Sequence, residues 1–276
     1  MFGSWTEPDR LASLAGEFQT ARPFDHVVIP DFFVPEVAKA LLEEFPDPGS
    51  PAANGLSWHH YDNPIENKWA LNDFDSRRLP IASHVFDHLQ SSDFVEKIRT
   101  ITGITNLEAD PHLHGAGLHA YPSGGKLDSH LDYSIHPVSG KERRVNLLVY
   151  LNPDWHAGYG GSLELWDADR TQRTAVIPPG WNCAVLFRTS DISWHGLPRP
   201  LRCPPGDFRR SLAIYYVSDA RPDATPRPKA EFVPDAAQEP IDPRLARLYE
   251  IRKQRLITPE DLADWPSWRQ DGAGWW

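Results

Sequence analysis

The chain has 276 residues, of which 40% are hydrophobic and 24% are charged. This length and composition allow one sizeable core with extensions. The formal net charge of −10 argues against a nucleic acid or a membrane surface as partner, because both attract basic protein surfaces.

The N-terminal stretch MFGSWTEPDRLASLAGEF lacks the basic flank and the apolar run of a signal peptide. No segment of the sequence approaches the apolar length of a membrane span. The two cysteines, Cys183 and Cys203, fit no disulfide framework and no zinc-ligand spacing. We therefore expect a cytoplasmic protein with reduced thiols.

Residues 1–112 are expected to form an extension of helices and loops that packs on the core. In chain order we predict a short strand, a helix, an irregular stretch rich in Pro, Asn, Gly and Asp, and two further helices, at 24–34, 35–45, 46–76, 78–90 and 93–102. Pro35 suits the first turn of its helix, and Gly103 is placed to end the last one.

From residue 113 to residue 218 the pattern changes to short segments of alternating apolar and polar residues. The eight segments are 115–122, 127–132, 143–151, 161–166, 172–177, 182–188, 193–197 and 208–217. Strands of this length and spacing indicate an antiparallel sandwich or barrel. Residues 219–276 are interpreted as a Pro-rich linker followed by a helical tail. The predicted fold class is thus mainly β with flanking helices (α+β).

Two His-x-Asp triplets occur, His60-Tyr61-Asp62 and His130-Leu131-Asp132. About one such triplet is expected by chance in a chain with this many histidines, so their context decides their meaning. Alternation along a strand puts His130 and Asp132 on one face. A solvent-facing edge strand would explain an isolated triplet equally well. The first triplet lies in the irregular stretch and is interpreted as part of a loop or lid.

A second histidine, His195, follows His130 by 65 residues in the segment SWHGLPRP. Two imidazoles and one carboxylate form the ligand set typical of non-haem Fe(II) sites, although zinc can use the same ligands. Arg209 lies in the apolar segment FRRSLAIYYVS, where a cation is costly unless it meets an anion. Alternation places Arg209 and Ser211 on one face of this strand and Arg210 on the other.

The segment 117–218 resembles the prolyl 4-hydroxylase-like branch of the Fe(II)/2-oxoglutarate-dependent oxygenases. The similar pieces are YPSGGKLDSHLD, RRVNLLVYLNPDW, GGSLELWD, WHGLPRP and RRSLAIYY. The resemblance implies a double-stranded β-helix (jelly-roll) core at 113–218. It also implies that Fe(2+) is held at a catalytic centre formed by His130, Asp132 and His195.

The same resemblance implies that Arg209 anchors the cosubstrate 2-oxoglutarate. Ser211 and Tyr150 are hydroxyl donors of the right type to assist Arg209. Tyr121 is expected to reach 2-oxoglutarate or its surroundings, with a buried structural tyrosine as the alternative.

The implied function is hydroxylation of an unactivated C–H bond with O₂, releasing succinate and CO₂, with ascorbate as a supporting reductant. The expected substrate is a prolyl residue, an amino acid or another small molecule. The alternative is a jelly-roll metalloprotein without oxygenase activity, either a zinc hydrolase or a metal-dependent binding module. The pair Arg209 and Ser211 discriminates between the oxygenase and the hydrolase, because a hydrolase needs no buried residues that bind the carboxylate of a cosubstrate.

Overall fold

The structure is a computed structural model, and it describes residues 1–73, 75–234 and 241–265. Within these residues, 13 strands join into one sheet in which every pair is antiparallel. The strands are β1 (His26–Ile29), β2 (His59–Asp62), β3 (Glu66–Leu71), β4 (Glu108–Ala109), β5 (Gly117–Tyr121), β6 (Lys126–Leu131), β7 (Glu142–Leu151), β8 (Leu163–Trp166), β9 (Arg173–Ile177), β10 (Trp181–Arg188), β11 (His195–Leu197), β12 (Arg209–Ser218) and β13 (Glu231–Phe232).

The strand order along the sheet is β1-β10-β7-β12-β5-β3-β6-β11-β8-β9. Off this path, β2 pairs with β3, β4 with β12, and β13 with β6. The sheet folds back on itself, because Leu163 and Leu165 of β8 share a buried cluster with Tyr150 of β7 and Phe187 of β10. The eight strands predicted between residues 113 and 218 are all present, and the mainly β class with flanking helices is confirmed.

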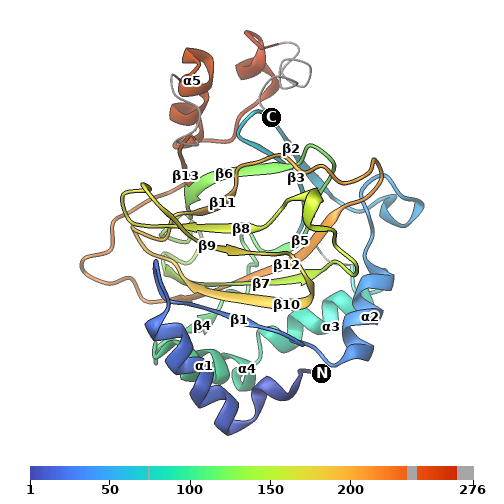
Figure 1. The fold of residues 1–276 in the computed structure, drawn as a ribbon, viewed down its shortest axis with the longest axis vertical. Helices are drawn as coiled ribbons and strands as arrows, with labels where there is room; N and C mark the ends of the chain where they lie inside the picture. The colour runs from blue at the N-terminus through green and yellow to red at the C-terminus, as the bar shows by residue number, and fades with distance from the viewer. Residues whose placement is uncertain (74, 235–240, 266–276) are drawn as a thin grey trace.

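Five α-helices flank the sheet in the described residues: α1 (Pro8–Thr20), α2 (Pro35–Glu44), α3 (Pro80–Leu89), α4 (Ser92–Thr102) and α5 (Pro243–Arg252). Figure 1 shows α1 to α4 gathered on one side of the sheet and α5 at the opposite end. Helix α4 ends as predicted, because Gly103 adopts a φ of 70° that glycine tolerates best. Helix α1 was not predicted. No helix in the described part of the chain is long and apolar enough to cross a membrane.

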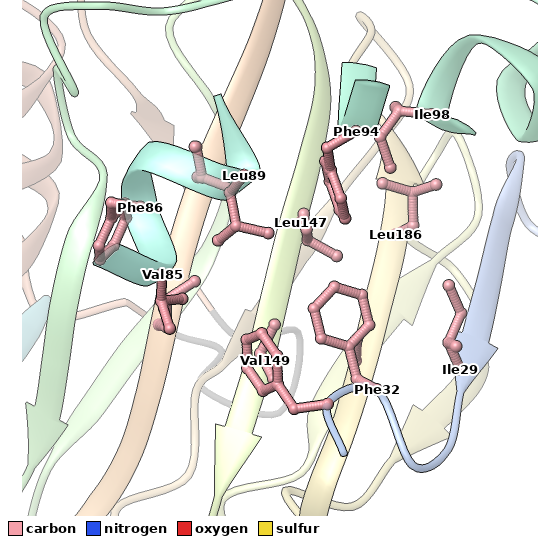
Figure 2. Packing of buried hydrophobic residues seen from close by; sticks show 14 of the residues in the cluster. Ile29, Phe32, Val85, Phe86, Leu89, Phe94, Ile98, Leu147, Val149 and Leu186 are labelled. Carbon is pink, nitrogen blue, oxygen red and sulfur yellow. The ribbon is translucent and has the colours of Figure 1, made fainter. Parts of the chain in front are cut away.

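The main core lies between the helices and the outer face of the sheet. Alternation turns Leu147 and Val149 of β7 toward this face, where they share a buried cluster with Phe94 and Ile98 of α4 and with Leu186 of β10 (Figure 2). The residues that alternate with them along β7, such as Asn146 and Tyr150, lie on the opposite face. The helices therefore stabilise one side of the strands and leave the other side for a pocket.

We expect Phe94→Ala to lower the free energy of unfolding by about 3–5 kcal/mol, because it removes a buried ring and leaves a cavity. Phe94 is 1% exposed and contacts Phe2, Trp5, Phe32 and Tyr216. Denaturant unfolding followed by circular dichroism measures the change. The matched control is Val138→Ala, since Val138 is 67% exposed and its substitution should stay within about 0.5 kcal/mol.

The prediction that residues 46–76 are irregular is wrong, because β2 and β3 form a hairpin there. Strand β3 also lies between β5 and β6 in the sheet. Glu66, Lys68 and Ala70 of β3 face a pocket, so this strand lacks the apolar alternation from which the other strands were predicted. The extension 1–112 thus supplies four strands of the sheet, β1 to β4, in addition to its helices.

The segment after residue 218 also joins the sheet. In β13, Glu231 pairs with Leu131 and Phe232 pairs with His130 of β6. Helix α5 lies within the helix predicted near 243–256, and a short 3-10 helix follows at Pro259–Leu262. The Pro-rich stretch is therefore partly a strand that covers the residues around His130.

Candidate active site

His130, Asp132 and His195 lie together because two strands are paired. In the antiparallel register of β6 and β11, His130 is directly opposite His195, and Asp132 follows the last residue of β6. One ligand atom from each residue lies within 4.8 Å of the others. The Nε2 atoms of His130 and His195 are each 3.8 Å from a carboxylate oxygen of Asp132. All three side chains are buried, and among the described residues no other cluster of this kind occurs.

The two imidazoles are oriented by backbone carbonyl groups. The Nδ1 atom of His130 is 2.9 Å from the Asp128 oxygen, and that of His195 is 2.8 Å from the Ser193 oxygen. A carbonyl oxygen only accepts, so each Nδ1 carries a hydrogen, and each Nε2 is left as the ring atom that can bind a metal. This arrangement is the one by which proteins commonly fix a metal-binding histidine.

The ionisation states also suit a cation. Burial, together with the nearby His195, lowers the pKa of His130 to about 3, so its ring is neutral at pH 7. Burial alone would raise the pKa of Asp132, but Arg143 and the two histidines outweigh it, and the pKa is lowered. The site thus offers a neutral imidazole at His130 and a carboxylate at Asp132, with the imidazole of His195 beside them.

Asp132 is held by two further side chains that the sequence did not reveal as site residues. A guanidinium nitrogen of Arg143 lies 3.4 Å from Oδ1, and the amide of Asn146 donates to Oδ2 over 3.4 Å. The Arg143 guanidinium also lies between the rings of Tyr133 and Tyr215, 3.4 and 3.3 Å from their centroids. Simple alternation would turn it away, but a register shift opposite Tyr216 and Val217 reverses the pattern.

The three candidate ligands line a pocket of about 290 Å³. Arg209 and Ser211 of β12 line the same pocket, as does Tyr121 of β5. In the sheet, Arg209 is opposite Tyr121, and Ser211 is opposite Tyr150 of β7. The structure therefore brings six of the seven predicted site residues to one pocket, and the seventh, Tyr150, lies behind it against Arg209.

Arg209 is 2% exposed and has no carboxylate partner among the described residues. Its Nε donates to the Gly161 oxygen over 2.6 Å, and its Cζ lies 4.7 Å from the Tyr150 ring and 5.1 Å from the Tyr121 ring. A Cβ at Gly161 would come within 2.5 Å of Leu201 and 3.0 Å of Arg209, and φ is 79° there, so the position requires glycine. Burial raises the pKa of Tyr150 to about 12, keeping its hydroxyl protonated.

The neighbouring Arg210 has a different environment. Its Nε donates to Asp47 over 2.7 Å, outside the pocket, and its side chain is 21% exposed. His60 of the first triplet also lies outside the pocket, with its ring stacked on Trp69 at 3.9 Å between centroids.

The segment after residue 218 closes the pocket, and the sequence did not predict this role. Phe232 stacks on His130 with centroids 4.8 Å apart. The Tyr249 hydroxyl of α5 donates to Asp128 over 2.7 Å, and Arg252 pairs with Glu66 of β3 at 2.6 Å. Asp128 is only 1% exposed beneath these contacts. The sequence does not indicate that Tyr249 and Arg252 contact Asp128 and Glu66, because these residues meet only when the tail folds back over the sheet.

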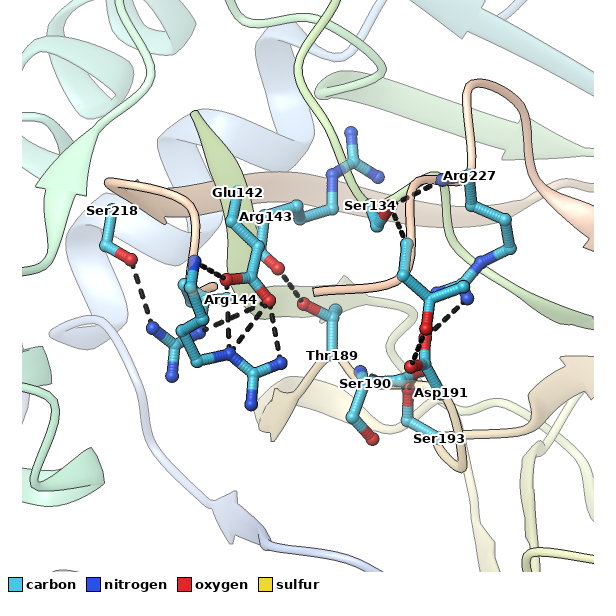
Figure 3. A network of polar contacts seen from close by, with 12 residues as sticks. Ser134, Glu142, Arg143, Arg144, Thr189, Ser190, Asp191, Ser193, Ser218 and Arg227 are labelled. Carbon is cyan, nitrogen blue, oxygen red and sulfur yellow. Dashed lines mark hydrogen bonds and ion pairs between the residues drawn. The ribbon is translucent and has the colours of Figure 1, made fainter. Parts of the chain in front are cut away.

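A polar network that includes Arg227, Asp191 and Glu142 holds the start of this segment in place (Figure 3). Arg227 donates from Nε to the backbone carbonyl oxygen of Asp132 over 2.9 Å and pairs with the Asp191 carboxylate at 2.6 Å. Asp191 begins the turn that holds Ser193, the carbonyl partner of His195. Arg221 pairs with the buried Glu142 at 2.8 Å. These contacts link the backbone of both ligand-bearing strands to residues 221–227.

The donor set fits Fe(2+), since neutral imidazole and carboxylate ligands with open positions are typical of non-haem iron oxygenases. The buried, unpaired Arg209 fits the far carboxylate of 2-oxoglutarate, because a desolvated guanidinium is costly without an anion. Both observations concern side chains of a single pocket.

Comparisons with known proteins agree with this geometry. Residues 116–217 match the family model of the 2OG-Fe(II) oxygenase superfamily. Prolyl 3-hydroxylase OGFOD1 of Mus musculus is 26% identical over 231 residues, which are 80% of this chain and 37% of that protein. Prolyl 3,4-dihydroxylase OGFOD1 of Ostreococcus tauri is 32% identical over 120 residues, 41% of this chain and 22% of that protein. The chain thus spans about a third or less of these curated relatives.

Solved structures show the same fold. A prolyl hydroxylase from Trichoplax adhaerens, in complex with a peptide of hypoxia inducible factor, superposes with a TM-score of 0.56 at 17% identity, covering 78% of this chain and 94% of that one. A prolyl-4-hydroxylase from Pseudomonas putida gives a TM-score of 0.52 at 18% identity, covering 76% of this chain and 100% of that one. The predicted jelly-roll core is confirmed.

Residues 116–217 are thus similar to the 2OG-Fe(II) oxygenase superfamily, and the relatives and solved structures named above are prolyl hydroxylases. Fe(2+) and 2-oxoglutarate are the cofactor and cosubstrate that this family implies.

Proposed function

We propose that the protein is a 2-oxoglutarate-dependent Fe(2+) dioxygenase that hydroxylates a prolyl residue of a peptide or protein. His130, Asp132 and His195 hold the metal in this proposal, and Arg209 binds the far carboxylate of 2-oxoglutarate. Residues 113–218 act as the oxygenase core, and the flanking segments complete its pocket. The named relatives, which are prolyl hydroxylases, support the prolyl substrate.

The observation that carries the proposal is the position of Arg209. It is a buried cation without an anionic partner among the described residues, in the pocket that also holds the three candidate ligands. A hydrolase that used the same three ligands would have no need of this cation. The alternative of a zinc hydrolase or binding module is therefore not favoured.

When bound, Fe(2+) and 2-oxoglutarate supply the oxidising chemistry, in which O₂ is consumed, succinate and CO₂ are released, and one oxygen atom enters the substrate. The protein positions these groups. Arg209 would orient the cosubstrate through a charge-assisted contact with its far carboxylate, with Ser211 and Tyr150 as hydroxyl partners. Phe232 covers the ring of His130 and excludes water from that side. Ascorbate is proposed as a supporting reductant.

The test is turnover with Fe(2+), 2-oxoglutarate and a set of proline-containing peptides. We expect succinate release that depends on 2-oxoglutarate and O₂, together with a peptide mass gain of one oxygen atom measured by mass spectrometry. Replacing Fe(2+) by Zn(2+) should abolish both signals. Peptide hydrolysis supported by zinc, without any need for 2-oxoglutarate, would instead establish the alternative.

A further inference from the structure

The charge of the pocket is opposite to that of the chain. Its lining carries five cationic side chains, Lys68, Arg143, Arg209, Lys229 and Arg252. It carries two anionic ones, Glu66 and Asp132. Counted over these seven side chains, the lining has a net charge of +3, the difference between five and two, whereas the chain has a formal net charge of −10.

The cofactors do not remove this excess. Fe(2+) brings two positive charges and 2-oxoglutarate brings two negative charges, so together they leave the net charge of the lining unchanged. Arg252 is paired with Glu66, and Arg143 with Asp132. Arg209 is assigned to the cosubstrate. Two cations then remain without an ion-pair partner among the described residues.

These two cations are Lys68 and Lys229, and they come from distant parts of the chain. In β2 and β3, Tyr61 is paired with Lys68, and both line the pocket. The Lys68 amino group lies 5.1 Å from the centre of the Tyr61 ring. Lys229 precedes β13 in the segment that closes the pocket. The hairpin and the closing segment thus each contribute one lysine.

We propose that the substrate is an acidic peptide segment, in which carboxylate side chains beside the target residue pair with Lys68 and Lys229. This inference rests on the proposed function and adds the charge of the substrate to it. Charges around a recessed site attract oppositely charged partners and repel like-charged ones. The tyrosine rings of the pocket supply apolar contact for the target residue, while the two lysines select its neighbours.

The test uses three peptides that differ only beside one central proline, with two Asp, two Asn or two Lys residues. Binding to the full chain with Fe(2+) and 2-oxoglutarate is measured under anoxia by fluorescence anisotropy. We expect the acidic peptide to bind about tenfold more tightly than the basic one, from two partly exposed ion pairs. Raising the salt concentration should reduce this preference.

Substitution of the lysines identifies the charges responsible. Lys68→Met and Lys229→Met should each weaken binding of the acidic peptide by about threefold, and the double substitution should remove the preference. Lys68→Arg and Lys229→Arg should retain it. Lys39→Met on α2 is the matched control, because Lys39 lies outside the pocket and its side chain is 74% exposed.

Binding of 2-oxoglutarate, measured in the same samples, distinguishes a failure of the proposed function from a failure of the acidic-substrate inference. If 2-oxoglutarate binds but the three peptides bind equally, or the preference survives the double substitution, the inference of an acidic substrate is wrong and the proposed function stands. The inference of an acidic substrate is also wrong, and the proposed function stands, if 2-oxoglutarate binds but the acidic peptide shows no binding at a concentration of about 1 mM. If 2-oxoglutarate itself does not bind, the proposed function fails.

Discussion

Arg209→Ala is expected to weaken binding of 2-oxoglutarate by about 30-fold or more. Losing one partner of a desolvated, bidentate charge pair costs about 2–5 kcal/mol, and each factor of ten corresponds to about 1.4 kcal/mol. Arg209 is buried, and its guanidinium pairs with no carboxylate among residues 1–73, 75–234 and 241–265. Titration of the anaerobic Fe(2+) protein with 2-oxoglutarate, followed by its absorption spectrum, measures the change.

The next residue provides the control. Arg210 pairs with Asp47 on the other face of β12, so Arg210→Ala should change the affinity for 2-oxoglutarate by less than about threefold, the scale of an exposed ion pair. Equal losses at both positions, or a larger loss at Arg210, would show that the cosubstrate binds elsewhere. Circular dichroism of both variants should match that of the unaltered protein.

His130→Ala and Asp132→Ala are each expected to abolish turnover and to weaken Fe(2+) binding by at least about tenfold, since even the partners of metal ligands affect affinity by 10- to 100-fold. These side chains line the pocket and are absent from the apolar clusters, so the fold should be kept. Isothermal titration with Fe(2+) under anoxia gives the affinity.

His60→Ala is the matched control for the ligand variants, because His60 belongs to the other His-x-Asp triplet and stacks on Trp69 outside the pocket. Its Fe(2+) affinity should be unchanged. If this variant lost the metal while the His130 and Asp132 variants kept it, the metal would bind at the first triplet and the assignment to His130 and Asp132 would be wrong.

The strands of the core could be predicted from the sequence because their apolar residues alternate. In β7 and β12 one face packs on helices and the other lines the pocket, so the alternation also separated Arg209 from Arg210. Strand β3 was not predicted, because its residues do not show this apolar alternation. Its inward residues Glu66 and Lys68 face a polar pocket, and the sequence then resembles a loop.

Long-range pairings account for what else the sequence did not reveal. Nothing local to Arg252 or Tyr249 indicates that their partners are Glu66 and Asp128, 186 and 121 residues earlier. Arg143 was missed because a single bulge reverses the facing of the strand at that point. The contacts of Arg252 and Tyr249 depend on the tail folding back, and the position of Arg143 depends on a bulge. Neither feature produces a periodic pattern of residues in the sequence.

The position of β13 has a consequence for where the working unit ends. The family model stops at residue 217, but Phe232 covers His130, and the pocket wall continues to Leu256. A chain shortened to the matched residues would open the side of the chamber next to His130 to bulk water and free one edge of β6. The smallest fragment that keeps a closed chamber must therefore include the hairpin at 59–71 and extend to Leu256.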